Sequence, residues 1–306
     1  MSAGRVVLTG ATGFIGSYLA EELVAKGYEV LALRRTQSSL WRVASVAGHI
    51  TWVTIDEPDW QQQVVAWQAE YLVHAAWLGV GVGQRDDWNS QLSNLTFTME
   101  LLQTLLPGGL KKVVVLGSQA EYGAFHGRVD EGQPTQPVMA YGAVKLATLE
   151  LVRAYCSAQS LEWYWLRVFA VFGPREDAHW FVSFVAANFL KYQSPALTNC
   201  EQQYDYLFAP DLARAIVQTL PAAPGFSGVY NVGANRAISL RTMVDTIRDL
   251  TGTATSVQYG ALPYRPGQVM HMESSTSRFE HTFGPITQTA LPTALAATVE
   301  YVKQHQ

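Results

Sequence analysis

Three polar side chains of this sequence stand at a spacing that suits proton transfer: Ser118, Tyr141 and Lys145. Tyr141 and Lys145 lie four residues apart near the start of a predicted helix, so both side chains share one face. A nearby ammonium favours the phenolate and would lower the tyrosine pKa from about 10. Such a tyrosine can exchange the proton of an alcohol/carbonyl pair during hydride transfer. Ser118 follows a predicted buried strand, so we expect its hydroxyl at the sheet edge where ligands bind.

A glycine-rich turn near the N-terminus predicts a dinucleotide site. Glycines at 10, 13 and 16 fall between a predicted strand and a predicted helix. There they permit a tight turn and close backbone approach, and the helix offers its positive end to a pyrophosphate. The spacing is one residue longer than the common dehydrogenase pattern, and a plain turn is the alternative, but the strand–turn–helix context favours the cofactor. The residues expected to contact it in this turn are Gly10, Thr12, Gly13, Phe14, Ile15 and Gly16.

The second predicted strand ends in two arginines, at the point where such proteins select their cofactor. An acidic residue there binds the ribose of NAD, whereas arginine accommodates the 2′-phosphate of NADP. Here Arg34 and Arg35 follow Leu33 with no acid nearby. A guanidinium pair complements a phosphate. The sequence therefore predicts NADPH, with NAD less favoured; the alternative is two solvated arginines on a loop.

Alternating strands and helices must position these residues. Apolar runs with strand character and longer stretches with helical spacing succeed each other through the first half of the chain. The predicted strands are 5–9, 29–33, 50–55, 71–74, 111–116 and 161–168, and the predicted helices are 14–26, 91–106 and 138–158. This order predicts an α/β fold, a doubly wound parallel sheet of the Rossmann type with helices on both faces.

The order of elements changes after residue 172. Shorter elements follow, with helices expected near 181–189, 211–220, 240–250 and 294–302. We therefore expect an NADP-binding domain over residues 1–172 and a smaller, mostly substrate-binding domain over residues 173–306. A strand predicted at 228–232 indicates that a segment near 205–250 returns to the main sheet.

The composition excludes several classes of protein. With 48% hydrophobic and 15% charged residues, the chain is typical of a globular protein and unlike a disordered one. A net charge of −4 without a basic stripe argues against a nucleic-acid partner. No apolar run approaches the roughly 18 residues of a membrane span, and no signal peptide is visible. The two cysteines form neither a metal pattern nor a disulfide framework. We expect a cytoplasmic protein without a metal ion.

Taken together, these motifs resemble the extended short-chain dehydrogenase/reductase family, which includes sugar-nucleotide epimerases, dehydratases and reductases. The matching segments are 9–16, 74–76, 117–123, 141–145, 167–174, 204–213 and 230–233. The resemblance implies that Ser118, four residues before Tyr122, is catalytic and that Lys145 holds the nicotinamide ribose. It also implies a homodimer built from the helices 91–106 and 138–158. The further residues expected at the cofactor on this resemblance are Asp56, Ala75, Ala76, Tyr141 and Phe169.

Departures from the family patterns narrow the expected reaction. Gln119 and Ala120 stand where sugar 4,6-dehydratases carry an Asp-Glu pair, so elimination of water lacks its acid and base. Ala120 also replaces the cysteine of GDP-fucose synthases. Arg34 replaces the usual aspartate of epimerases. The sequence therefore predicts an NADPH-dependent reductase of a nucleoside-diphosphate 4-keto-6-deoxy sugar. Three alternatives remain: a nucleotide-sugar epimerase that retains its cofactor, a reductase of a small carbonyl compound, and a non-catalytic NADP(H) sensor.

The resemblance also suggests substrate contacts. Arg265 is similar to the family's arginine that faces the nucleotide diphosphate, although an exposed loop arginine is the alternative. His179 and Trp180 open an expected lid helix, and Trp77 follows the fourth strand; ordinary packing explains all three equally well. The substrate residues expected from the sequence are Trp77, Gln119, His179, Trp180 and Arg265.

Overall fold

The larger part of the molecule is a parallel sheet. In the computed structural model, which describes residues 2–81 and 83–305, seven strands pair in the order β10-β7-β5-β4-β1-β2-β3, all parallel. Their bounds are β1 (Arg5–Thr9), β2 (Glu29–Arg34), β3 (Ile50–Thr54), β4 (Tyr71–His74), β5 (Lys112–Ser118), β7 (Glu162–Val168) and β10 (Gly228–Val232). The predicted doubly wound α/β fold is confirmed. Strand order reverses between β1 and β4, where ligands bind in such sheets.

Helices cover both faces because alternate strand residues point to opposite sides. Val6 and Leu8 of β1 join one core with Leu19, Leu212 and Phe279, whereas Val7 joins the core on the other face. The first face is covered by α1 (Phe14–Ala25), α6 (Ala209–Val217) and α8 (Ser277–Phe283). The second is covered by α2 (Trp60–Trp67), α3 (Trp88–Leu105) and α4 (Ala140–Ala158). No helix of the described chain is long and apolar enough to cross a membrane.

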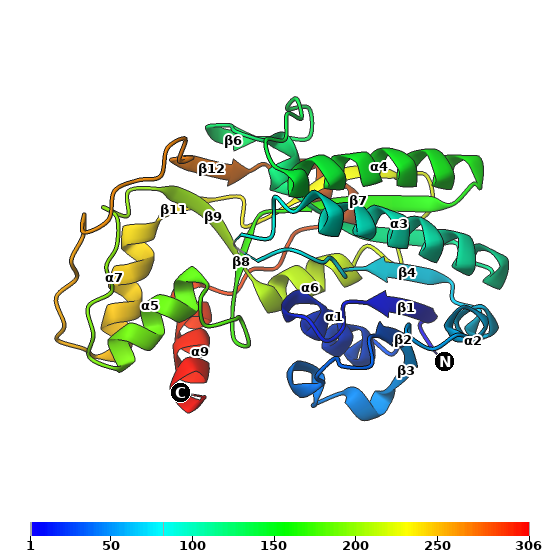
Figure 1. Ribbon diagram of the computed structural model, residues 1–306, viewed down its shortest axis with the longest axis horizontal. Helices are drawn as coiled ribbons and strands as arrows, with labels where there is room; N and C mark the ends of the chain where they lie inside the picture. Colours follow the sequence, from blue (N-terminus) through cyan, green and yellow to red (C-terminus); the bar gives the residue numbers. More distant parts are fainter. Residues whose placement is uncertain (1, 82, 306) are drawn as a thin grey trace.

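A second, smaller sheet stands beyond the carboxyl ends of the first. Its strands, in the order β11-β9-β12-β6 with β8 paired to β9, are β6 (Gly127–Val129), β8 (Ala170–Phe172), β9 (Gln203–Phe208), β11 (Ala237–Ser239) and β12 (His271–Ser274). The helices α5 (Phe181–Leu190), α7 (Leu240–Thr251) and α9 (Leu291–Gln304) form a core of their own. Figure 1 shows the arrowheads of β1 and β4 pointing toward this second part. The residues expected to act in catalysis and cofactor binding lie at this edge, the carboxyl edge of the large sheet.

The elements that the sequence analysis missed are short. The strands of the second sheet have three to six residues, too few for an apolar period to identify them. The helices α2 and α8 and four 3₁₀ turns were also missed, the turns being η1 (Trp41–Val43), η2 (Ala47–His49), η3 (Leu106–Gly108) and η4 (Gln119–Tyr122). The chain crosses between the two parts several times, since β6 belongs to the small sheet and β10 to the large one. The domain boundaries remain a prediction.

Several uncharged side chains are exposed on the outer faces of α3 and α4, which pack side by side. On α4 the exposed residues Ala147, Leu151, Ala154 and Ala158 follow one another at helical spacing. The α3 side of this face carries Trp88 and Leu92, and these two side chains, like Leu151, are at least two-fifths exposed. Exposed apolar area in contiguous helices favours association. We therefore expect the homodimer to use this face.

Substitution of Leu151 by glutamate should convert the dimer into a monomer, because it places a charge in the middle of this face. Light scattering at micromolar concentration measures the mass directly. Leu250→Glu is a matched control, since Leu250 is an equally exposed leucine at the end of α7. A wild-type protein with the mass of one chain would contradict the dimer.

Candidate active site

The turn after β1 has no room for side chains. Gly10 has a φ of +76°, and a Cβ atom there would lie 2.8 Å from the amide nitrogen of Ala76. A Cβ atom on Gly16 would lie 1.9 Å from the carbonyl oxygen of Gly10. Helix α1 then begins at Phe14 with no side-chain cap and no acidic residue in its first turn. Its first N–H groups are therefore free for an anion. This cradle fits a dinucleotide, and Thr12, Gly13 and Ile15, also expected there, are half-buried in it.

A buried hydrogen-bond chain fixes the neighbouring strand end. The amide of Ala76 donates to Thr9 Oγ1 (3.1 Å), which lies 2.7 Å from His74 Nδ1. His74 Nε2 lies 3.0 Å from Thr98 Oγ1, and that hydroxyl donates to the carbonyl of Asn94 (2.7 Å). Because Thr98 uses its proton on Asn94, Nε2 of His74 must carry the ring proton and Nδ1 must accept from Thr9. Burial lowers the pKa of His74 to about 3, so the ring is neutral.

Two arginines stand at the end of β2, and the acid beside them, Asp56, comes from the turn after β3. The guanidinium carbon of Arg34 lies 5.6 Å from the ring centroid of Trp52, and its buried Nε has no partner among the described residues. Arg35 is exposed. Asp56, expected at the cofactor, accepts a hydrogen bond from the amide of Thr36 (2.6 Å), and this bond holds the pKa of the carboxyl below its usual value. An unpartnered buried N–H beside the cradle is a group that a bound anion would satisfy.

Ser118, Tyr141 and Lys145 come together at the carboxyl end of β5. Helix α4 packs directly on the turn η4, because Gly142 lacks a side chain: a Cβ there would lie 2.4 Å from the carbonyl oxygen of Ala120. This contact brings the Tyr141 phenol within hydrogen-bonding reach of the Ser118 hydroxyl. Lys145 Nζ donates to the carbonyl of Leu116 at 2.5 Å. Thus the spacing read from the sequence does place the three groups in one cluster.

The charge state of this cluster differs from the expectation. Burial raises the pKa of the Tyr141 phenol, and this outweighs the opposing effects of the Ser118 hydrogen bond and the nearby charge of Arg85. Burial also lowers the pKa of Lys145 to about 7, against the attraction of the Glu121 carboxylate. The expected lowering of the tyrosine pKa by Lys145 is therefore wrong for this structure. The lysine lies deep in the protein, and its Nζ is 5.9 Å from the Tyr141 ring centroid.

A buried carboxylate that the sequence analysis did not identify positions Ser118. Glu121 Oε1 accepts hydrogen bonds from the amide of Ser118 (2.7 Å) and from Trp165 Nε1 (2.9 Å). Its other oxygen accepts from Arg167 Nε at 2.7 Å. Glu121 is fully buried, and Arg167 supplies the counter-charge that such burial requires. A glutamate three residues past the serine of an expected active site gives no periodic signal, so only the fold shows its role.

Trp77 is held over the lysine. Its Nε1 donates to Gln91 Oε1 (2.8 Å), and its ring centroid lies 3.6 Å from Lys145 Nζ. Gln91 also donates to the carbonyl of Gly79 (2.9 Å), so α3 fixes the whole turn after β4. The sequence carried a signal for this arrangement. Gln91, Asn94 and Thr98 place polar groups on the buried face of a helix, where each needs a partner.

The other predicted residues are less closely gathered. Trp180 lies near the cluster, because the guanidinium of Arg85 contacts both its ring and that of Tyr141. His179 lies beside Trp180, with ring centroids 5.2 Å apart. Gln119 is the half-buried first residue of η4. Phe169 packs its ring against Phe125 in a separate apolar group.

Arg265 is not brought to the cluster by any described contact. It lies exposed in the loop before β12, where its charge acts on Tyr204 of the small sheet.

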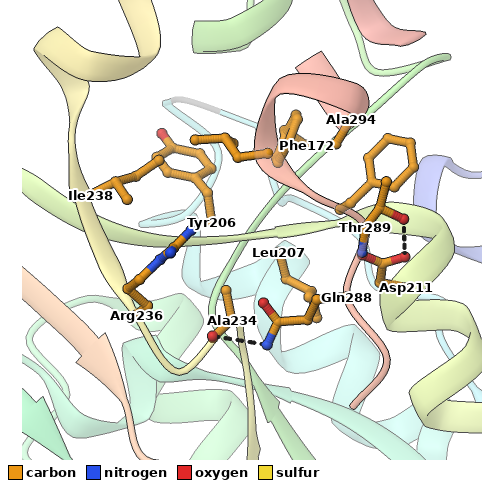
Figure 2. A pocket seen from close by; sticks show the side chains of 12 residues that line it. Phe172, Tyr206, Leu207, Asp211, Ala234, Arg236, Ile238, Gln288, Thr289 and Ala294 are labelled. Carbon is orange, nitrogen blue, oxygen red and sulfur yellow. Dashed lines mark hydrogen bonds between the residues drawn. The ribbon is translucent and has the colours of Figure 1, made fainter. Parts of the chain in front are cut away.

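A pocket of the second part of the molecule lies away from this chemistry. Figure 2 shows it between β8, β9 and the start of α9, lined by residues that include Tyr206, Arg236 and Ile238. Several of its polar groups pair with one another or with the backbone: Thr289 donates to Asp211, and Gln288 donates to the carbonyl of Ala234. None of the residues predicted to bind cofactor or substrate lines it. We therefore place the candidate active site at the carboxyl edge of the large sheet and not here.

Comparisons with known proteins agree with this geometry. A model of the NAD dependent epimerase/dehydratase family matches residues 6–233. The dTDP-6-deoxy-L-talose 4-dehydrogenase (NAD(+)) of Aggregatibacter actinomycetemcomitans is 27% identical over 264 residues, which cover 85% of this chain and 96% of that protein. The UDP-glucose 4-epimerase of Mycolicibacterium smegmatis is 26% identical and matches over 98% of each chain.

A solved structure shares both the fold and part of the sequence. It is MoeE5 in complex with UDP-glucuronic acid and NAD, with a TM-score of 0.83 and 27% sequence identity. The match covers 99% of this chain and 100% of that one. The resemblance inferred from the motifs is confirmed, and it extends over nearly the whole molecule.

Replacement of His74 by glutamine should make stability less sensitive to acid. The pKa of His74 is near 6.5 in the unfolded chain, and burial lowers it to about 3 in the folded protein. Between these values the unfolded chain binds more protons, so the stability due to the neutral ring is complete above pH 6.5 and lost as pH falls toward 3. The difference in unfolding free energy between wild type and His74→Gln should therefore shrink from pH 7.5 to pH 5 in urea titrations. His281→Gln, on the exposed surface of α8, is the control. A constant difference would refute the assignment.

Proposed function

The chain belongs to the NAD dependent epimerase/dehydratase family, and on that premise we propose that it is an enzyme acting at C4 of a nucleotide-linked sugar. The proposed net reaction is epimerisation, in which C4 is oxidised to a ketone and reduced again from the other face. The observation that carries the proposal is the cluster of Ser118, Tyr141 and Lys145 beside the glycine cradle. It is supported by relatives named for chemistry at the 4 position.

Each residue of the cluster has a role in this reaction. Tyr141 takes the proton of the sugar hydroxyl as the C4–H bond breaks, and it returns that proton to the carbonyl oxygen afterwards. Ser118 donates a hydrogen bond to the same oxygen, held in place by Glu121 through the backbone. Lys145 would hold the ribose of the nicotinamide, as the family resemblance implies, and the nearby charge of Arg85 favours the phenolate form of Tyr141. A nicotinamide bound in the cradle supplies the acceptor and donor of the hydride.

The reductase expected from the sequence is the second candidate. One observation favours it, namely that β2 ends in Arg34 and Arg35 rather than in an acid. The relative from Aggregatibacter is named a 4-dehydrogenase, which is the same chemistry in one direction only. We place the epimerase first because a UDP-glucose 4-epimerase matches over 98% of each chain. The two differ in stoichiometry, since an epimerase returns the hydride and a reductase consumes one reduced cofactor per sugar.

Replacement of Tyr141 by phenylalanine should lower kcat by about a hundred- to ten-thousand-fold, the usual effect of one acid–base group. Binding of the nucleotide sugar should persist, because the ring remains. The assay follows the conversion of UDP-glucose and of dTDP-linked 6-deoxyhexoses, together with the absorbance of reduced cofactor. Tyr155→Phe changes a tyrosine farther along α4 and is the control. Full activity of the Tyr141 variant would show that the cluster is structural. Net consumption of cofactor would make the reductase the correct assignment.

The choice of cofactor rests on the same two arginines. The Aggregatibacter relative is named for NAD(+), and MoeE5 was solved with NAD. We nonetheless propose that Arg34 and Arg35 accept a 2′-phosphate, because the buried Nε of Arg34 lacks a partner among the described residues and no acid follows β2. This preference concerns the adenosine end of the cofactor and leaves the chemistry at C4 unchanged.

The double variant Arg34→Ala/Arg35→Ala should bind NADPH about ten- to a hundredfold more weakly, the equivalent of one lost charged contact of about 1.5–3 kcal/mol. Its affinity for NADH should change little. Fluorescence titration gives both dissociation constants. Arg5→Ala, which removes an arginine from the opposite end of β1, controls for net charge. Equal binding of the two cofactors by the wild type would leave NAD as the cofactor.

A further inference from the structure

Arg85, a residue that the sequence analysis passed over, lies at the candidate active site. It belongs to the segment between β4 and α3, which Figure 1 shows at the edge facing the second part of the molecule. Its carbonyl oxygen accepts a hydrogen bond from the amide of Tyr141 at 2.8 Å. The carboxylate of Asp86 accepts from the amide of Ala140 at 3.0 Å. The backbone of Arg85 is therefore attached to the same helical turn that carries the proposed catalytic tyrosine.

The guanidinium of Arg85 is held between two aromatic rings. Its central carbon lies 5.2 Å from the ring centroid of Tyr141 and 5.7 Å from that of Trp180. The Nε atom donates to the carbonyl of Val80 (2.9 Å), which fixes the plane of the group. Tyr141 belongs to the large sheet's helices and Trp180 to the second part, so the cation sits where the two parts meet. Cation–π contacts orient a guanidinium without using its N–H groups.

No acid among the described residues pairs with this cation. The two nearest in sequence are engaged elsewhere: Asp86 binds the start of α4, and Asp87 caps the start of α3 through the amides of Asn89 and Ser90. No salt bridge joins Arg85 to a carboxylate in residues 2–81 and 83–305, and its terminal nitrogens have no acceptor there. A planar fork of free N–H groups beside the reacting atoms suits a carboxylate or a phosphate.

We propose that Arg85 binds a carboxylate carried by the sugar itself, so that the substrate is a nucleoside-diphosphate hexuronic acid. This inference rests on the proposed function, because it takes Tyr141 to act on the hydroxyl at C4. In a hexuronic acid the carboxylate is attached to C5, the ring atom next to C4. The diphosphate is attached to C1, on the opposite side of the ring. A cation that contacts the ring of the tyrosine acting at C4 is therefore placed to meet a group on an atom next to C4 rather than the diphosphate on C1.

The test compares three ligands that differ in one group at a time: UDP-glucuronic acid, UDP-glucose and UDP. Calorimetry measures their dissociation constants in the Tyr141→Phe background with NADP present, so that the sugars bind without turning over. The variants are Arg85→Gln, Arg85→Lys and the control Arg248→Gln, which removes an arginine from the surface of α7. A parallel set of dTDP-linked ligands covers the case of a different base.

The expected result has two parts. Without a substitution at Arg85, the protein binds the glucuronic acid derivative at least tenfold more tightly than the glucose derivative. Arg85→Gln weakens the uronic acid alone by about ten- to a hundredfold, Arg85→Lys by less, and Arg248→Gln by no more than about twofold. Unchanged affinity for UDP would show that the Gln variant is folded.

Two results would overturn the assignment while leaving the proposed function in place. One is equal affinity for the uronic acid and the neutral sugar before Arg85 is changed. The other is an equal loss for all three ligands in Arg85→Gln, which would make the arginine a diphosphate contact. If neither the UDP nor the dTDP set binds while NADP does, the proposed function itself fails, and the uronic acid with it.

Discussion

The buried ring of His74 holds together the elements that form the candidate active site at the carboxyl edge of the large sheet. Its two nitrogens link Thr9 at the end of β1 to Thr98 of α3, and the same chain holds the amide of Ala76. That amide lies where a side chain on Gly10 would strike it. Since every member of the chain is satisfied and buried, breaking one bond leaves an unpaired polar group, which costs more than the bond itself contributes. The hydrogen-bond chain therefore fixes the glycine turn after β1 against the turn that carries Trp77.

On the other side of the site, close contact between two backbone segments holds the elements together. Gly142 lets α4 touch the turn that begins at Ser118, and the serine is fixed from below by the carboxylate of Glu121. That buried charge is balanced by Arg167 and also attracts Lys145. One carboxylate thus fixes the backbone of the serine and favours the charged form of the lysine. Its burial is stable only because both cations lie within the same low-dielectric region.

The protonation states of Tyr141 and Lys145 affect which direction of the proposed C4 reaction is favoured, oxidation of the alcohol or reduction of the ketone. Burial keeps Tyr141 protonated, which suits it to give a proton to a ketone, and it lowers the pKa of Lys145 toward neutral pH. Taking a proton from an alcohol needs the phenolate, which the Ser118 hydrogen bond and the Arg85 charge both favour. An anionic substrate held by Arg85 would offset part of that charge. The proposed reversible reaction at C4 therefore depends on two cations, Arg85 and Lys145, of which the sequence motif contains only Lys145.

Local spacing was enough to predict the parallel sheet, the glycine turn and the cluster of Ser118, Tyr141 and Lys145. The period of each strand and helix, the glycine turn and the four-residue spacing of Tyr141 and Lys145 are each specified by a few neighbouring residues. The small sheet could not be predicted, because its strands are too short to show a period and pair over long distances in the chain. The same limit hid Glu121, Arg85 and the support of Trp77 by Gln91. The raised pKa of Tyr141 was missed for a related reason: desolvation is a property of everything packed around a group, and only the tertiary structure brings those neighbours together.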